Sequence, residues 1–190
     1  MEQAKKDTIL DAAKKLFSHF GYKKTSMDDV AKEAGVAKGT VYLAASSKSD
    51  LLYQTILRLL RNCMYTMGHV IDPQFPADEM LPRMIELELA HLQNEPLLQE
   101  LLLGGVGTSG WSQRFDELRR MARNNHVEVL KLGQRQGIFR EDIDPDTVAI
   151  IIQDLEAASF LFHRNETHTD SKLWQTALQL VLDGLKPQTQ

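Results

Sequence analysis

The sequence predicts an all-α protein in which a small N-terminal domain is joined by a long helix to a larger helical domain. Apolar residues recur with the 3.6-residue period of amphipathic helices along most of the chain, and no segment alternates convincingly with the period of two that marks a strand. The length of 190 residues suffices for a small domain fused to a larger one. We place these domains at residues 1–47 and 48–190, with the linking helix at about 48–67.

The first helix is expected from about residue 5 to residue 20, where an apolar stripe runs along one face and Gly21 follows as a terminator. The stripe consists of Ile9, Ala12, Ala13, Leu16, Phe17 and Phe20. Further helices are expected at about residues 27–34, 38–44, 48–67, 77–93, 96–103, 112–136, 145–163 and 171–185. Pro96 and Pro145 suit the first turns of their helices, because a proline there gives up no intrahelical hydrogen bond.

Residues 24–52 form a pattern that is typical of a helix-turn-helix. The predicted helix at 38–44 has only two turns, so its neighbours must hold it in place. Gly35 can adopt the positive φ that a tight turn needs, and Ala31 is small where the two helices must cross. The shared core is expected to contain Val30, Val36 and Val41. The alternative, an ordinary helical hairpin of a bundle, does not require this combination of small, flexible and apolar positions.

Capping residues flank two of the three helices in this region. Thr25 or Ser26 can cap the helix at 27–34, and Ser47 with Asp50 can start the long linking helix. Ala37 precedes the short helix and is a poor N-cap, because it offers no side-chain acceptor.

The short helix carries side chains that suit the major groove of DNA. Lysine can read guanine, and threonine or leucine can contact the methyl group of thymine. Tyr42 and Lys48 are expected to contact phosphates, Lys48 with the help of the adjacent helix N-terminus. The candidate DNA-binding residues are Thr25, Ser26, Lys38, Gly39, Thr40, Tyr42, Leu43 and Lys48. The sequence therefore predicts double-stranded DNA as a partner.

The charge distribution fits this prediction. Residues 1–61 contain 11 Lys and Arg against 7 Asp and Glu, whereas residues 62–190 contain 11 against 19. The excess of positive charge is modest. A basic N-terminal part on an acidic remainder nevertheless suits a protein that presents one end to a polyanion.

Residues 8–57 resemble the N-terminal domain of the TetR family of bacterial transcriptional regulators, and the rest of the chain matches that family only in architecture. The matching stretches are 9–13, 16–17, 21–22, 25–27, 30–31, 34–36, 38–42, 47–48 and 51–52. The resemblance implies a dimeric repressor that binds a palindromic operator and is released by a small effector. Ala44 and Ala45 stand where the family usually carries His or Tyr and then often Phe, so a phosphate contact and a packing residue are missing.

The resemblance also implies a sensing cavity among the later helices and a homodimer interface made by the last two helices of each subunit. The candidate lining, which suits a small hydrophobic or aromatic effector, is Met67, Met84, Leu87, His91, Trp111, Phe115, Leu118, His126 and Phe162. The candidate interface residues are Leu161, Leu173, Trp174, Ala177, Leu178, Val181 and Leu185. Each lining residue could equally be core. For His126 the pattern favours a core histidine with a hydrogen-bonded tip, and Trp174 could fill the core of its own subunit.

The sequence shows no catalytic constellation, so we expect neither an enzyme nor a cofactor or metal site. His91, His126, His163 and His168 have no partner at zinc-ligand spacing, and the glycine-rich segment 104–110 lacks the lysine of a phosphate-binding loop. The longest apolar run is too short to cross a membrane. With one cysteine, Cys63, and no apolar leader at the start of the sequence, a cytoplasmic location is expected.

Two functional classes remain open at this point. The first is a ligand-controlled repressor that binds DNA, as the resemblance implies. The second is a helical ligand-binding or protein-binding module that keeps the N-terminal domain but has weakened or lost DNA binding. The alanines at 44 and 45 favour this second class. Salt-dependent binding to operator DNA separates the two classes.

Overall fold

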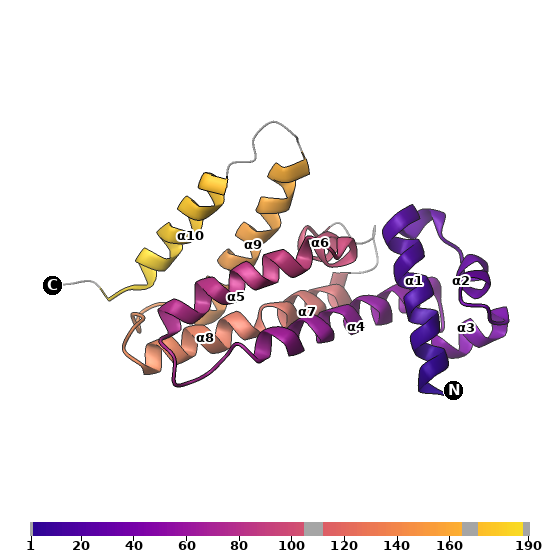
Figure 1. Cartoon of the computed structure of the whole chain (residues 1–190), viewed down its shortest axis with the longest axis horizontal. Helices are drawn as coiled ribbons and strands as arrows, with labels where there is room; N and C mark the ends of the chain where they lie inside the picture. The colour runs from indigo at the N-terminus through magenta and orange to yellow at the C-terminus, as the bar shows by residue number, and fades with distance from the viewer. Residues whose placement is uncertain (1, 105–111, 165–170, 188–190) are drawn as a thin grey trace.

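The computed structural model describes residues 2–104, 112–164 and 171–187, except for the side chains at 112, 161–164 and 171–174. The described residues form α-helices and no strand, which confirms the predicted all-α class. The helices are α1 Gln3–Lys24, α2 Met27–Glu33, α3 Lys38–Ala44, α4 Lys48–Gly68, α5 Ala77–Leu92, α6 Pro96–Leu102, α7 Ser112–Ala122, α8 Asn124–Arg135, α9 Pro145–Arg164 and α10 Ser171–Leu185. Figure 1 shows their arrangement.

Helices α1, α2 and α3 form a small unit at one end of the molecule, which we call the head (Figure 1). α1 packs against α2 and α4, and α2 packs against α3. The predicted stripe of α1 is buried from Ile9 to Phe17, whereas Phe20 is exposed. Gly21 has a φ of 80° and interrupts the helix as expected, but the chain then continues helically to Lys24.

Helix α4 connects the head to the remaining helices, which we call the body. Its 21 residues span about 30 Å, at 1.5 Å per residue. α1 covers part of it, and α5 and α7 pack along it in the body. A continuous buried side explains how one helix can belong to both cores; its members are Leu51, Leu52, Thr55, Ile56, Leu59, Leu60, Cys63 and Met67.

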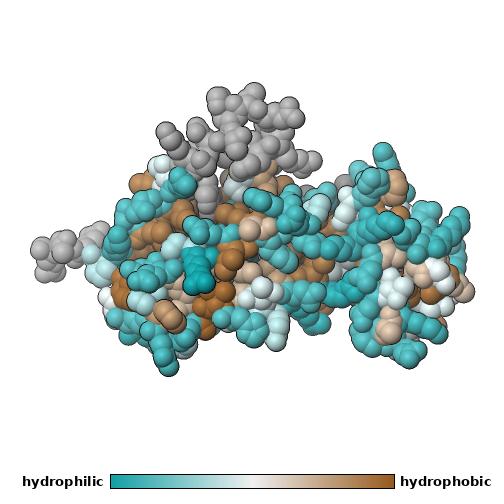
Figure 2. Space-filling model, viewed as in Figure 1, coloured by the Kyte–Doolittle hydropathy of each residue, from teal (hydrophilic) through white to brown (hydrophobic). Residues whose placement is uncertain are grey.

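The body is a layered bundle in which α5 packs on α8 and α8 packs on α9. α9 also packs against α6 and α10, and Figure 1 shows the pair of α9 and α10 at the top of the view. Figure 2 shows polar side chains over most of the visible face of the head and a band of exposed apolar side chains over the body. Among the described residues, the helices are too short or too polar to cross a membrane.

The predicted helix at 112–136 is wrong in one respect, because the chain breaks there into α7 and α8. Arg123, between the two helices, has φ −87° and ψ 1°, outside the α-helical region. The apolar stripe predicted along this segment is nevertheless buried throughout; it consists of Phe115, Leu118, Ala122, His126, Val129 and Gly133. The break preserves the register of the buried face, which is why periodicity alone does not reveal it.

Gly133 on α8 gives space to the ring of Phe139, which is buried just after the helix ends. A Cβ placed on Gly133 would lie 2.1 Å from Cδ2 of that ring. The backbone N–H groups of Ile138 and Phe139 both donate to the Gly133 carbonyl, at 2.9 and 3.1 Å. Only glycine fits at this position without moving the aromatic ring.

Candidate nucleic-acid interface and the interior of the body

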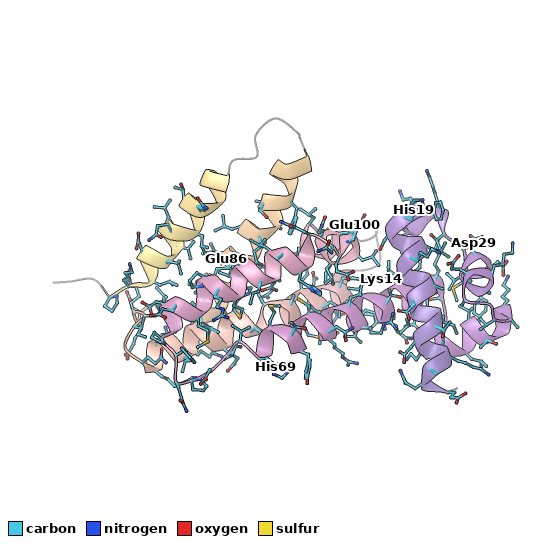
Figure 3. The ribbon with its side chains drawn as sticks, in the orientation of Figure 1. Lys14, His19, Asp29, His69, Glu86 and Glu100 are labelled. Carbon is cyan, nitrogen blue, oxygen red and sulfur yellow. The ribbon has the colours of Figure 1, made fainter. Side chains whose placement is uncertain are left out.

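Helix α2 is fixed at its start by a reciprocal cap, and Ser26 rather than Thr25 is the capping residue. The Ser26 hydroxyl accepts from the backbone N–H of Asp29 at 3.2 Å, and the Asp29 carboxylate accepts from the N–H of Ser26 at 2.9 Å. Hydrogen bonds from the hydroxyl and the N–H of Ser26 hold the pKa of Asp29 below its ordinary value. The cap sets where α2 begins, on the far side of the head from the body (Figure 3).

The turn between α2 and α3 has the geometry that the sequence predicts. Gly35 has a φ of 65°, and the N–H of Val36 reaches back to the carbonyl of Ala31 at 3.0 Å. Ala31, Val30 and Val41 are buried in the shared core, and Val36 is half-buried against it. Ala37 makes no side-chain cap, as expected, so α3 is held by packing.

Helix α3 turns large side chains outward. Leu43 is 77% exposed and Tyr42 is 47% exposed, while Val41 and Ala44 on the opposite side are buried. Lys38 and Gly39 are exposed as well, and Thr40 is half-buried. A seven-residue helix that exposes a leucine and a tyrosine beside a lysine presents an interaction surface of mixed apolar and basic character.

Lys38 already has a partner within the head. Its Nζ lies 2.9 Å from Oδ1 and 3.0 Å from Oδ2 of Asp28, and both side chains are largely exposed. The hydrogen bond to Asp28 raises the pKa of Lys38, so the lysine stays charged. An exposed pair of this kind contributes little to stability and exchanges readily for another anion.

Two of the predicted DNA contacts serve the fold instead of facing outward. Thr25 is buried, and its hydroxyl donates to the carbonyl of Gly21 at 3.0 Å, so that side chain is not available to DNA. Lys48 is half-buried. Its Nζ donates to the carbonyls of Tyr22 and Thr25 at 2.9 and 3.0 Å and lies 4.3 Å from the centre of the Tyr22 ring.

The alanines at 44 and 45 are both buried at the end of α3. The carbonyl of Ala44 accepts from Nε2 of Gln54 at 3.1 Å. Asp50 of α4 accepts from the N–H of Ser46 at 2.9 Å, from Gln54 at 3.2 Å and from Arg114 of α7 at 3.3 Å. This network ties the end of α3 and the start of α4 to the body, and the sequence did not predict it.

Five of the predicted cavity-lining residues lie buried in the body: Met67, Met84, Phe115, Leu118 and His126. Leu87 is wrong as a lining residue, because 41% of it is exposed on the outer side of α5. His91 is half-buried and lines a surface groove with Asp7 and Arg58, away from the interior. Trp111 and the side chain of Phe162 lie outside the described residues.

His126 is buried in the body, as expected for a core histidine, and two buried carboxylates lie beside its ring. Its Nε2 lies 3.2 Å from Oε2 of Glu88 on α5 and 3.5 Å from Oε1 of Glu156 on α9. Burial lowers the pKa of His126, but the two carboxylates outweigh it and raise the value to about 10. Burial raises the pKa of Glu156 to about 7. In the sequence, Glu88 and Glu156 interrupt the apolar faces of their helices, and this is the signal that could have revealed buried carboxylates.

The predicted interface residues on α10 divide into two groups. Leu178 and Leu185 are buried within the subunit, so little of either side chain is left for the predicted dimer interface. Ala177 and Val181 are half-buried, and the side chains of Leu161, Leu173 and Trp174 lie outside the described residues. Apolar surface does remain on α9 and α10, because Leu180 of α10 is 69% exposed and Ile151 of α9 is 47% exposed.

The family model for bacterial regulatory proteins of the tetR family matches residues 9–55, the segment that contains the capped α2, the Gly35 turn and the exposed α3. Residues 9–55 therefore carry the N-terminal domain of the tetR family. The chain is 28% identical over 158 residues to the uncharacterized HTH-type transcriptional regulator YhgD of Bacillus subtilis, with 81% of each chain covered. It is 22% identical over 186 residues to the HTH-type transcriptional repressor KstR2 of Mycobacterium tuberculosis, covering 96% of this chain and 93% of KstR2.

Among solved structures, the crystal structure of the transcriptional regulator FadR from Bacillus subtilis in complex with stearoyl-CoA superposes with a TM-score of 0.80 and 22% identity. The superposition covers 94% of this chain and 98% of that one. The likeness extends the shared fold from the head to the body. The named relatives and the solved protein that shares the fold are transcriptional regulators, which is the class that the sequence predicted.

Proposed function

We propose that this protein is a dimeric repressor that inserts α3 into the major groove of an operator and leaves it when the body binds a small hydrophobic effector. The exposed face of α3 carries the proposal, because Leu43 and Tyr42 stand out from a helix whose other side is buried. Leu43 and Thr40 face the base edges, where they suit thymine methyl groups, and Lys38 suits guanine. Tyr42 is placed for a phosphate contact.

Lys48 has a changed role in this proposal. Its ammonium group must give up the carbonyls of Tyr22 and Thr25 before it can reach a phosphate. We therefore assign DNA contact to Lys38 and Tyr42 and assign to Lys48 the positioning of α1 against α4.

Selection of binding duplexes from a random-sequence library, followed by titration at several salt concentrations, tests DNA binding. Leu43→Ser is expected to change the preferred base at one position of each half-site, whereas Lys38→Ala should reduce the slope of log affinity against log salt by about one unit. Tyr65→Ser is the matched control, since Tyr65 is exposed on α4. Absence of salt-dependent binding would overturn the repressor. It would favour a module without DNA binding, an alternative that rests on Ala44 and Ala45, whose side chains are buried.

The effector proposal rests on the interior of the body. Met67, Met84, Phe115 and Leu118 are buried side chains of the adaptable and aromatic kinds that accommodate apolar ligands. FadR of Bacillus subtilis, which shares the fold, was crystallised with stearoyl-CoA, so we propose an acyl or similarly apolar effector. Thermal-shift measurements with acyl-CoAs, free fatty acids and aromatic compounds test this.

A compound that binds the folded chain, present at a concentration of 100 times its dissociation constant, should raise the free energy of unfolding by about 2.7 kcal/mol. The same compound should weaken operator binding, because an effector shifts an equilibrium only if it prefers one state. Leu118→Trp, which would fill the interior, should abolish the shift, while Leu87→Trp on the outer side of α5 should leave it unchanged. A screen in which only small anions stabilise the chain would overturn the hydrophobic effector.

A second copy of the chain is the proposed cover for the outer face of α9 and α10. Val148, Ile151 and Leu155 lie on one side of α9 without full burial, and Leu180 adds to that surface on α10. A two-fold dimer through this layer would place the two α3 helices on successive major grooves, about 34 Å apart.

Sedimentation of the wild type at micromolar concentration, beside Ile151→Glu and Leu180→Glu, tests the dimer. The wild type should sediment as a dimer and both variants as monomers. Leu43→Glu, equally exposed but on the head, should remain dimeric. Leu178 is unsuitable for this test, because its substitution would disturb the core of the subunit itself. A monomeric wild type would contradict the proposal.

A further inference from the structure

The interior of the body contains three ionisable side chains from three different helices. Glu88 of α5, His126 of α8 and Glu156 of α9 are 8%, 0% and 1% exposed. One possible ligand atom from each lies within 4.8 Å of the other two. Because the residues come from separate helices, no short spacing in the sequence marks the group, which we call the Glu88–His126–Glu156 cluster.

The hydrogen bonds of the cluster are incomplete. Both ring nitrogens of His126 and Oε1 of Glu156 are buried without a hydrogen-bond partner among the described residues. The contacts of Nε2 at 3.2 and 3.5 Å thus lack the geometry of N–H donation to either carboxylate. Buried polar atoms are rarely left unpaired, since each costs about 1–3 kcal/mol. The unpaired atoms of His126 and Glu156 therefore call for a ligand.

The charges of the cluster indicate what kind of ligand would satisfy it. When a metal ion takes the place of the proton on Nε2 of His126, the two carboxylates and the neutral imidazole carry a net charge of −2 in an apolar interior, where unpaired anions are strongly disfavoured. A divalent cation would neutralise this charge without adding a bulky group. Within the described part of the chain, no arginine or lysine pairs with the cluster, because its ion pairs join only His126 to the two glutamates.

We propose that the Glu88–His126–Glu156 cluster binds one divalent transition-metal ion of the zinc class, through Nε2 of His126 and one oxygen of each glutamate. Bonds of 2.0–2.2 Å in tetrahedral geometry place neighbouring ligand atoms about 3.3–3.6 Å apart, close to the 3.2 and 3.5 Å found around Nε2. Imidazole with carboxylate oxygens suits zinc, iron(II) or manganese, whereas calcium and magnesium prefer oxygen alone.

The bound ion would join α5, α8 and α9 at one point. Three protein ligands leave a fourth position for water or for a donor atom of a small molecule. Cys63 on α4 is also buried in the body, and burial followed by the charges of Glu88 and Glu156 raises the pKa of its thiol to about 12. Its sulfur does not belong to the set of ligand atoms that lie within 4.8 Å of one another, so it is not among the proposed ligands.

Metal binding is tested on the untagged full-length chain after treatment with EDTA and dialysis. Titration with zinc chloride, read by competition with a chromophoric chelator, should give one tight site per chain. The melting temperature should rise on adding one equivalent of zinc. Cobalt(II) should give the intense visible absorption of a four-coordinate site. A wild type that takes up no zinc at one equivalent overturns the proposal, whatever the variants do.

The variants locate the site. His126→Asn and Glu156→Gln should each weaken zinc binding by at least about 100-fold, with helical circular dichroism retained. His91→Asn is the matched control, because His91 lies beside Asp7, Asp11 and Glu95 in the surface groove and is the competing site for adventitious zinc. Loss of binding in His91→Asn but not in Glu156→Gln would overturn the assignment. Failure of the protein to bind DNA would not affect the proposed metal site, because zinc uptake is measured without DNA.

Discussion

Lys14 of α1 and Glu95, which precedes α6, form an ion pair that joins the head to the body. Nζ of Lys14 lies 2.6 Å from Oε1 of Glu95, and the glutamate side chain is only 13% exposed. In Figure 3 Lys14 lies on the side of α1 that faces the body. Because Glu95 is mostly buried, the pair is shielded from solvent more than a surface pair is, and its loss leaves a buried charge without compensation.

We expect Lys14→Met to lower the free energy of unfolding by about 1–3 kcal/mol, with much of the loss recovered in the double variant with Glu95→Gln. Urea unfolding of the four members of this cycle measures the coupling. Lys15→Met is the control, since Lys15 pairs with Glu33 within the head and is mostly exposed; it should cost at most about 1 kcal/mol. Equal losses for both lysines would contradict the role of the head–body pair.

Asp28 restrains the lysine that we assign to base recognition. Asp28→Asn should strengthen operator binding about two- to five-fold at low salt, because Lys38 no longer has to leave its partner and one negative charge is removed beside the DNA. Electrophoretic or anisotropy titrations with the selected duplex measure this. Asp78→Asn, the same charge change on α5, should have no effect. If the gain survives in Asp28→Asn with Lys38→Ala, it does not come from freeing the lysine.

Asp50 is expected to make the stability of the protein depend on acid pH. Burial raises the pKa of Asp50, but the hydrogen bonds from Ser46, Arg114 and Gln54 outweigh it, so the pKa lies below its ordinary value. An aspartate in the unfolded chain has a pKa of about 3.9. The stabilisation is therefore complete above that pH and is lost as the pH falls through the lower pKa of the folded chain.

Asp50→Asn should accordingly lower the free energy of unfolding by about 1–3 kcal/mol at pH 7, and this difference should shrink towards pH 2. Urea unfolding of wild type and variant across that range gives the comparison. Ser46→Ala removes the hydroxyl that donates to Asp50 at 3.2 Å but keeps the backbone N–H, so it should show a smaller loss with the same pH trend. A loss that is constant with pH would show that the charge of Asp50 does not matter.

Gly133 tests the packing of α8 against Phe139. Gly133→Ala should destabilise the chain by about 1–3 kcal/mol, because the added methyl overlaps the buried ring. Gly184→Ala is the matched control, since a Cβ there meets nothing within 4 Å; in a helix it should be neutral or stabilise by up to about 1 kcal/mol. Thermal or urea unfolding separates the two, and a Gly133→Ala variant as stable as the wild type would contradict the packing argument.

The sequence determined the helices, the turn and the head. Periodicity placed the helices within a few residues, since each must bury one face whatever its neighbours are. Gly35 and Ala31 predicted the helix-turn-helix, because the turn and the helix crossing have local steric requirements that few residues meet. These features depend on neighbours in sequence, so they can be read from the sequence alone.

Only the tertiary structure decided which side chains are buried and which groups they contact. Thr25 and Lys48 fit DNA contacts by their position in the sequence, yet the end of α1 takes up their hydroxyl and ammonium groups. Leu178 and Leu180 are indistinguishable by composition, but one is buried in the subunit and the other is exposed. Glu88, His126 and Glu156 come together from three helices whose packing no local pattern encodes. Helix formation is local, whereas burial and charge pairing depend on which surfaces meet when the helices pack.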